Sequence, residues 1–273
     1  MFVLFPLIIF IGIRKQWNRS FLLLLSLLCT LFIWARFIEP HIIIVQEQTL
    51  DLGIQKRIAL ISDLHLGVYK KELFLSKVLQ KIEALQPDFI LIAGDLTYEP
   101  KKEDIQQLFS PLKEIHIPVY VVLGNHDVEK PGPPIRDTLE QVLKGYNVNV
   151  LNNNMVSLEN FTLVGLGSNW NEEDDVTLLD NFNEQDTVIV LTHNPDTTLK
   201  YNNKNADLTL TGHTHCGQIR LPFIYRFVLP VVGNFDKGLY NTGDTSLFIT
   251  CGVGETGLPM RLFNPPQIDV LNL

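Results

Sequence analysis

Acidic and histidine side chains stand at the ends of short apolar runs in this sequence. The first run, Ile58–Ile61, predicts a buried strand and is followed by Asp63 and His65. A spacing of two residues puts both side chains on one face if the strand continues. A carboxylate beside an imidazole is a ligand pair that suits Zn, Mn or Fe. One Asp-x-His pair is weak support for a metal site, because a turn Asp and a surface His give the same pattern.

Four more apolar runs end in the same kinds of residue. They are Phe89–Ala93 before Gly94-Asp95, Val119–Leu123 before Gly124-Asn125-His126-Asp127, Val188–Thr192 before His193, and Leu208–Thr211 before Gly212-His213-Thr214-His215. The glycines let the backbone turn sharply. Five of the seven histidines lie at these ends, and only His41 and His116 do not. Histidines on a solvated surface would be scattered along the sequence. Their position at strand ends therefore predicts one metal site, formed by residues at the ends of five strands.

These motifs, in this order, resemble the calcineurin-like metallophosphoesterases over about residues 57–271. Asn194-Pro195-Asp196, Gly217–Pro222, Gly252-Val253-Gly254 and Gly257-Leu258-Pro259 are similar to one subgroup, the small membrane-linked bacterial phosphodiesterases and lipid pyrophosphohydrolases. The resemblance implies an α/β fold in which two mixed β-sheets pack as a sandwich flanked by helices.

The resemblance also implies two divalent metal ions, which could be Mn, Zn or Fe. It assigns Asp63, His65, Asp95 and His215 to the first ion and Asp95, Asn125, His193 and His213 to the second. Asp95 would bridge the two, and a carboxylate suits that place because it has two anionic oxygens. Such a pair of ions clamps the attacking and leaving oxygens of a phosphoryl transfer, and a hydroxide between them would be the nucleophile.

Four further residues are candidates beside this ligand set. The resemblance makes His126 the proton donor to the leaving oxygen and lets Asp127 orient its ring, the alternative being a structural histidine. Arg220 is a candidate phosphate clamp, although a surface arginine is an equal alternative. Cys216 stands where the family pattern has glycine, which leaves open a sulfur ligand to the metal.

Composition limits the possible partners. The chain has 273 residues and a net charge of -8, so it has no electrostatic reason to hold nucleic acid non-specifically. The expected partners are a phosphate-containing small molecule or lipid headgroup, and a membrane. Three cysteines, Cys29, Cys216 and Cys251, are too few for a disulfide framework. Only the last two could pair, and free thiols are expected.

The N-terminus holds two apolar runs, Met1–Ile13 and Phe21–Ile38, with basic residues at Arg14–Arg19 between them. The second run approaches the length of a membrane-spanning helix, and Trp17 and Trp34 flank it as interfacial aromatics do. A cleaved signal peptide and an apolar helix docked on the domain are the alternatives.

The length of the second run favours the membrane anchor. Residues 1–40 are therefore expected to anchor the protein in a bacterial inner membrane, as a hairpin or through the second run alone, and residues 41–273 to form the catalytic domain. Basic residues tend to stay in the cytoplasm, which would place the domain outside, but an anchor that does not cross leaves it inside.

The remaining pattern alternates strands with helices and then turns to short strands. Helices are expected at Lys71–Leu85, Glu103–Ile115 and Ile135–Lys144, an edge strand near Ile42–Val45, and later strands at Asn147–Leu151, Met155–Leu158, Phe161–Leu166, residues 247–251 and Ile268–Leu271. The acidic segment Trp170–Asp175 reads as a solvated loop, with a lid as the alternative.

The expected function is hydrolysis of a phosphodiester or pyrophosphate bond, with a lipid-linked substrate such as a nucleotide-sugar lipid. The alternatives are a non-catalytic, metal-stabilised membrane scaffold and a nuclease of the same family. Retention of Asp95 and His126 favours the enzyme over the scaffold. The acidic charge and the apolar N-terminus argue against the nuclease.

Overall fold

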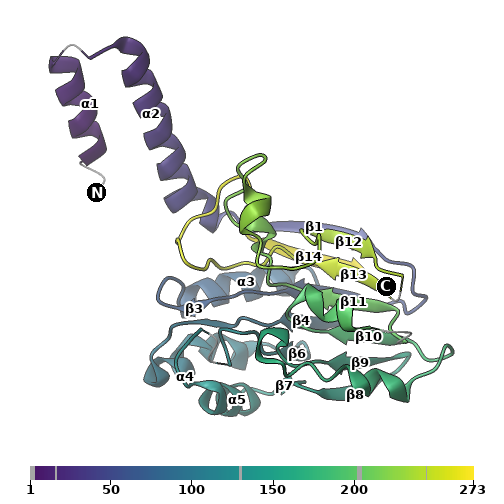
Figure 1. Cartoon of the computed structure of the whole chain (residues 1–273). Helices are drawn as coiled ribbons and strands as arrows, with labels where there is room; N and C mark the ends of the chain where they lie inside the picture. Colours follow the sequence, from purple (N-terminus) through teal and green to yellow (C-terminus); the bar gives the residue numbers. More distant parts are fainter. Residues whose placement is uncertain (1–3, 16, 129–130, 202–204, 244) are drawn as a thin grey trace.

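Figure 1 shows the computed structural model, which describes residues 4–15, 17–128, 131–201, 205–243 and 245–273. Two apolar helices, α1 (Leu4–Arg14) and α2 (Arg19–Ile33), extend away from a domain built on two β-sheets. The expected two-sheet α/β architecture is confirmed.

The first sheet has six strands, and its central members carry the first three motifs. In spatial order they are β1 (Ile44–Thr49), β14 (Gln267–Asn272), β2 (Arg57–Ile61), β4 (Phe89–Ala93), β6 (Val119–Val122) and β7 (Val148–Val150). Only β14 and β2 pair antiparallel. Because β2, β4 and β6 are parallel neighbours, their carboxyl ends lie at one edge.

The second sheet also has six strands and carries the last two motifs. Its order is β12 (Gly238–Asn241), β13 (Ser246–Ile249), β11 (Leu208–Thr211), β10 (Val188–Leu191), β9 (Phe161–Gly165) and β8 (Asn154–Leu158). The inner four strands are parallel and the two outer pairs are antiparallel. A small parallel pair, β3 (Leu66–Gly67) and β5 (Thr97–Tyr98), lies beside the first sheet's motifs.

Side chains of the central strands alternate between two cores. On β2, Ile58 and Leu60 join the core between the sheets, while Ala59 and Ile61 join the core beneath the helices, as a period of two requires. The helices over the first sheet are α3 (Glu72–Ala84), α4 (Ile105–Leu108) and α5 (Arg136–Gly145). The outer face of the second sheet is covered instead by short 3₁₀ turns, including Val176–Asn181 and Pro195–Lys200.

Local breaks account for the main differences from the expected elements. The helix expected over Glu103–Ile115 is only α4, with 3₁₀ turns before and after it. Pro111 has no backbone N–H to continue the α-helical hydrogen bonds, so α4 ends before it and the chain goes on as the 3₁₀ turn Ser110–Glu114. The short strand β12, which no apolar run marks, was not expected.

The second N-terminal run forms one continuous helical segment, Arg19–His41, whose 23 residues are long and apolar enough to cross a membrane. An 18-residue stretch within it has a mean hydropathy of 2.3. The helix α1, with 11 residues, is too short to span on its own. The C-terminal end of the long segment is fixed to the domain: Arg261 N donates to Ala35 O at 2.9 Å and Asn264 N donates to the Glu39 carboxylate at 2.5 Å.

Candidate metal centre

The expected ligands lie where the parallel strands of both sheets end. Three groups of described residues have ligand atoms that all lie within 4.8 Å of one another. Two of them, the triads Asp63, His65 and His215 and Asp95, His193 and His213, consist of expected ligands, and the third joins His65 and Asp95 to His126. Asn125, the remaining expected ligand, lines the same cavity as Asp95. The two sheets pack face to face. This packing brings together residues that are 150 positions apart in sequence, His65 and His215.

The first triad is compact and buried. His65 Nε2 lies 3.0 Å from His215 Nε2, and His215 Nε2 lies 3.3 Å from Asp63 Oδ1. All three side chains are shielded from solvent.

The second triad is centred on Asp95. His193 Nε2 lies 3.2 Å from Asp95 Oδ2 and 3.0 Å from His213 Nδ1. The same carboxylate oxygen lies 3.6 Å from His65 Nε2, so Asp95 stands between the triads. The other ring nitrogen of His193, Nδ1, donates to Ala93 O at 2.7 Å, which leaves Nε2 for a ligand.

Several buried polar atoms of the site lack hydrogen-bond partners among the residues that the structure describes. Asp63 Oδ1 and Asn125 Oδ1 accept no hydrogen bond, and leaving such an atom unsatisfied costs about 1–3 kcal/mol. His193 Nδ1 donates to Ala93 O and His213 Nε2 donates to Pro230 O. If both rings are neutral, the two nitrogens that face each other at 3.0 Å, His193 Nε2 and His213 Nδ1, therefore both carry lone pairs. Divalent cations would satisfy these atoms, and carboxylate, imidazole and amide donors suit Mn, Zn or Fe. The residues therefore fit a metal centre.

Charge and burial set the protonation of the ligands. Burial lowers the pKa of His65 and of His213 to about 3, and holds the pKa of His215 well below its usual value. Neutral imidazoles are the form that binds metal. Burial also opposes charge on His193, but the Asp95 carboxylate outweighs it and raises the pKa of His193 to about 9. Without metal, the positive charge of protonated His193 thus compensates the negative charge of Asp95, as a bound cation would.

The ligand loops hold an uncommon backbone conformation. Positive φ angles occur at five expected ligands: Asp63 (52°), His65 (47°), Asp95 (52°), His213 (69°) and His215 (47°). Each such residue costs about 1–3 kcal/mol and persists only where its surroundings enforce it. The enforcing contacts are hydrogen bonds between loops, among them Asp63 N to Gly94 O at 2.9 Å and Gly212 N to His193 O at 3.0 Å.

Two motif glycines are required by close approach to ligands. A Cβ at Gly124 would lie 2.1 Å from Asp95 Oδ1, and one at Gly212 would lie 2.4 Å from Ser62 Oγ and 2.7 Å from Asp63 Oδ2. Any side chain at either position would displace a ligand carboxylate.

A family model described as calcineurin-like phosphoesterase matches residues 56–217, which is more than half of the chain. The chain belongs to the calcineurin-like phosphoesterase family. The resemblance drawn from the motifs is thereby confirmed.

Relatives within the family come from several bacteria. An uncharacterized metallophosphoesterase of Campylobacter jejuni is 31% identical over 243 residues, which cover 86% of this chain but only 63% of that protein. The metallophosphoesterase YkuE of Bacillus subtilis is 30% identical, with 88% of each chain covered. The UDP-2,3-diacylglucosamine pyrophosphatase LpxG of Chlamydia muridarum is 26% identical, covering 88% of this chain and 92% of that protein.

The fold is also similar to a solved structure. The TT1561 protein of Thermus thermophilus superposes with a TM-score of 0.50 at 14% identity, covering 72% of this chain and 90% of that one. At that identity the likeness concerns the fold alone.

The expected contact between Asp127 and the His126 ring is not formed. The Asp127 carboxylate accepts from Leu96 N at 3.0 Å, Thr97 N at 2.9 Å and Gly124 N at 3.0 Å. Its oxygens are thus taken by the loops after β4 and β6, and the expectation of an orienting carboxylate is wrong. His126 Nδ1 has no hydrogen-bond partner in the structure. What fixes His126 is its backbone N–H, which donates to Asp95 Oδ1 at 3.0 Å.

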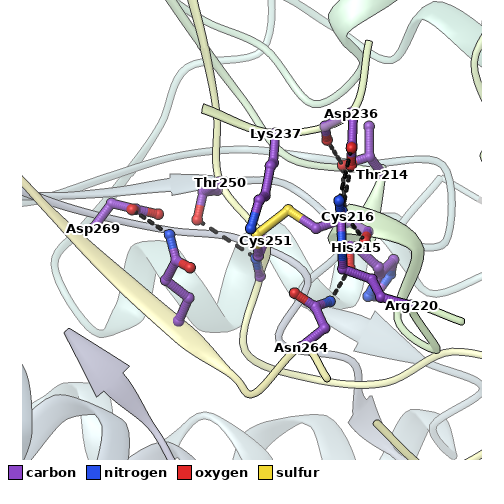
Figure 2. Close-up of a disulfide and its surroundings, with 12 residues drawn as sticks. Thr214, His215, Cys216, Arg220, Asp236, Lys237, Thr250, Cys251, Asn264 and Asp269 are labelled. Atoms are coloured by element: carbon purple, nitrogen blue, oxygen red, sulfur yellow. Dashed lines mark hydrogen bonds and ion pairs between the residues drawn. A yellow bond between two sulfur atoms is a disulfide. The ribbon is translucent and has the colours of Figure 1, made fainter. Parts of the chain in front are cut away.

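Arg220 is engaged within the protein. Its guanidinium bonds both oxygens of Asp236, at 2.6 and 3.0 Å, donates to Cys216 O at 2.7 Å and lies 4.0 Å from the Tyr225 ring centroid. Figure 2 shows this pairing beside His215. Arg220 therefore ties the loop after His215 to the following segment through three hydrogen bonds from Nη1 and Nη2, and its role as a phosphate clamp stays a prediction.

Cys216 and Cys251 form a disulfide, so the expectation of free thiols is wrong. Strands β11 and β13 are neighbours, and each cysteine follows one of them, which brings the two Cα atoms within 4.9 Å. Neither sulfur is then available as a metal ligand. The bond links two residues 35 positions apart, next to His215 (Figure 2). A disulfide that closes a loop of this size stabilises the folded state by about 2–4 kcal/mol. Cys29 is free and buried.

A cavity of about 510 Å³ opens over the metal-binding residues. Asp95, Asn125, His126 and Trp170 line it, and the Trp170 ring centroid lies 4.7 Å from that of His213. Trp170 is therefore part of the site, while Glu172 and Asp175 of the segment Trp170–Asp175 are exposed. Its buried Asp174 bonds Lys200 Nζ at 2.5 Å, which holds the segment in place.

Arg261 organises the site and carries no sequence signal. It is fully buried, and its guanidinium donates to the carbonyl oxygens of Cys251, Gly252, Gly254 and Asn264 at 2.7–3.1 Å. Asn264 in turn donates from Nδ2 to His215 O at 2.7 Å. This arginine thus fixes the loop behind His215. No local motif marks an arginine whose partners are all carbonyl groups brought by the fold.

Proposed function

We propose that this family member hydrolyses a phosphodiester or pyrophosphate bond in a lipid-linked substrate. The observation that carries the proposal is the pair of buried ligand triads that meet at Asp95 and face one cavity. A site for two cations at the floor of a cavity suits phosphoryl transfer, where charge on the transferred group must be neutralised.

In this proposal the ligands divide between two ions. Asp63, His65, Asp95 and His215 hold one ion, and Asp95, Asn125, His193 and His213 hold the other. When bound, the cations would neutralise phosphate charge and make coordinated water more acidic. Burial and the loop hydrogen bonds keep the ligands in place before substrate arrives.

His126 is the proposed acid. Its half-buried ring faces the cavity 5.1 Å from the His65 ring and 5.3 Å from the Tyr98 ring, centroid to centroid. Held through its backbone by Asp95, it can hand a proton to the leaving oxygen of a substrate in the cavity.

Two features favour a lipid-linked substrate. Ile219, Val228 and Leu258 make one side of the cavity apolar, and the helical segment Arg19–His41 would hold the domain at a bilayer. The LpxG relative is named for a lipid pyrophosphate substrate. Residues 1–40 then serve as the anchor, residues 41–273 as the catalytic domain, and the inner membrane is the location.

The test is hydrolysis by the purified full-length chain. With Mn²⁺ it is expected to cleave bis-p-nitrophenyl phosphate. It should lose activity in a chelator and regain it when Mn²⁺ is restored, because the triads supply ligands and the positive charge comes from the metal ions. Release of p-nitrophenol measures the rate. A chain that binds metal but stays inert with Mn²⁺, Zn²⁺, Fe²⁺ and Co²⁺ would instead support the scaffold. Salt-dependent binding to DNA would support the nuclease.

The disulfide bears on which face of the membrane the domain occupies. Disulfides persist in oxidising compartments, so the Cys216–Cys251 bond favours the outer face of the inner membrane. That side also follows if Arg14, Lys15 and Arg19 stay in the cytoplasm while the long helix crosses. A lipid phosphate without a cytoplasmic nucleotide then becomes the favoured substrate.

Counting thiols in cells tests this location. After alkylation in acid-quenched cells, one cysteine, Cys29, is expected to react before reduction and all three after it. A polyethylene-glycol maleimide that shifts the gel band measures the count. A Cys29→Ser chain should show none before reduction. Three reactive thiols in unreduced wild-type protein would place the domain in a reducing compartment and contradict the outer face.

A further inference from the structure

Two loops beside the metal centre present large apolar side chains to solvent. Phe223 is 90% exposed, Phe227 88% and Val232 91%, all in the segment 221–232. Leu258 and Phe263, in the segment 257–263, are exposed as well. A contiguous exposed apolar surface on a soluble domain marks an interaction site. We name these five residues, together with Ile224 and Val228, the apolar rim.

The apolar rim lies where the long helix leaves the domain. In Figure 1 the green segment around residues 221–232 and the yellow loop that follows β13 both stand at the base of α2. The contact is direct for the second loop, because Arg261 N donates to Ala35 O and Asn264 N donates to Glu39. The rim and the end of the apolar helix therefore share one side of the domain.

The apolar rim also borders the mouth of the cavity. Val228 and Leu258 line the cavity together with His126 and His215, and both are more than half exposed. Val228 thus belongs both to the cavity that His126 lines and to the segment that carries the exposed phenylalanines.

The charges around the rim suit a bilayer. Segments 221–232 and 257–263 contain no aspartate or glutamate. Their charged residues are Arg261, which is buried, and Arg226, which is exposed and bonded to the Tyr225 hydroxyl. Asp236, which accepts from the Tyr225 hydroxyl at 2.9 Å, is paired with Arg220. Aromatic and aliphatic side chains with a basic neighbour are the composition that binds the interface of anionic lipids.

We propose that the apolar rim inserts into the membrane that the long helix anchors, so that the cavity opens at the depth of the lipid headgroups. The helix keeps the rim close to that surface, so the effective concentration of membrane is high and even a weak affinity of the rim for lipid gives binding. This rests on the proposed anchor and deepens the proposed function. The substrate is a phosphate whose acyl chains stay in the bilayer along Val228 and Leu258 while its head reaches the metal-binding residues.

A fluorescent probe on the rim tests the insertion without any assay of activity. Full-length Cys29→Ser protein carrying Phe227→Cys is labelled with nitrobenzoxadiazole, with the disulfide intact, and placed in vesicles of phosphatidylethanolamine and phosphatidylglycerol. The control is Gln141→Cys, an exposed position on α5, far from α2 in Figure 1. Because a bilayer excludes hydrated anions, quenching by iodide is expected to be about threefold or more weaker at position 227 than at 141. Quenching by spin-labelled lipid is expected to be stronger.

Equal accessibility to iodide at the two positions would overturn the insertion. Shielding from iodide without quenching by lipid would overturn it too, and would point to a second copy of the chain covering the rim. Quenching by spin-labelled lipid at 227 alone supports it.

A kinetic comparison then links the rim to substrate access. Phe223→Ser with Phe227→Ser changes two residues that do not line the cavity. The pair is expected to leave hydrolysis of soluble bis-p-nitrophenyl phosphate unchanged. It should lower kcat/KM about tenfold for the p-nitrophenyl ester of a diacyl phosphatidic acid in vesicles, since the rim presents the substrate.

The outcomes of the two experiments are separable. An equal effect on both substrates would overturn the link to substrate access. If wild-type protein cleaves neither ester, the proposed function fails, while the fluorescence result still decides whether the rim inserts.

Discussion

Replacing Asp95 by asparagine is expected to remove metal from both triads and to lower hydrolysis of bis-p-nitrophenyl phosphate by about 10³-fold or more. Asp95 Oδ2 lies 3.2 Å from His193 Nε2 and 3.6 Å from His65 Nε2, so one carboxylate serves both groups. An amide keeps the shape but loses the charge that would balance two cations. Metal content by mass spectrometry and the rate of p-nitrophenol release measure the two effects.

Asp137→Asn is the matched control, since Asp137 is exposed on α5 and should change neither quantity. Circular dichroism shows whether the Asp95 variant still folds. An Asp95→Asn chain that keeps two metal ions and full activity would contradict both the bridging role and the assignment of the site.

Replacing His126 by glutamine is expected to retain both metal ions and to lower the rate by about 10²–10⁴-fold, the usual contribution of a general acid. His126 lines the cavity and lies outside the two proposed ligand sets, and its Nδ1 has no hydrogen-bond partner in the described part of the chain. The loss should be smaller for a p-nitrophenyl ester than for an alkyl ester, because p-nitrophenolate leaves readily without a proton. Rates on the two esters, with metal content, measure this.

The exposed His116 provides the control, and His116→Gln should behave as wild type. Loss of metal in the His126 variant would have a different meaning. His126 also lies with His65 and Asp95 in a third group whose ligand atoms are within 4.8 Å. Such a result would make His126 a ligand and remove it as the acid, as would an equal loss on both esters.

The contrast between the enzyme and a metal-stabilised scaffold rests on these two variants. Asp95 is needed for metal in either case, because the unpaired atoms around it require a cation. His126 is needed only for turnover. A scaffold would therefore depend on Asp95 for stability and be indifferent to His126.

The sequence by itself determined the strands and the residues that follow them. Short apolar runs such as Ile58–Ile61 and Phe89–Ala93 predict buried strands, and the structure has strands there. The position of a polar residue at a strand's end follows directly from its place in the sequence. Glycines such as Gly124 and Gly212 belong to the same local pattern. These features depend on neighbours in sequence, which is why they could be predicted.

Only the tertiary structure decided which distant groups are partners. Cys216 meets Cys251 because β11 and β13 are adjacent, and Arg220 meets Asp236 because a loop folds back over it. Asp127 is used by backbone N–H groups, since burial leaves those donors no water to bond. The apolar rim likewise arises from two segments about 30 residues apart that meet at the end of α2. Hydrogen bonds, disulfides and exposure depend on distances through space, and those are fixed only when the two sheets pack together.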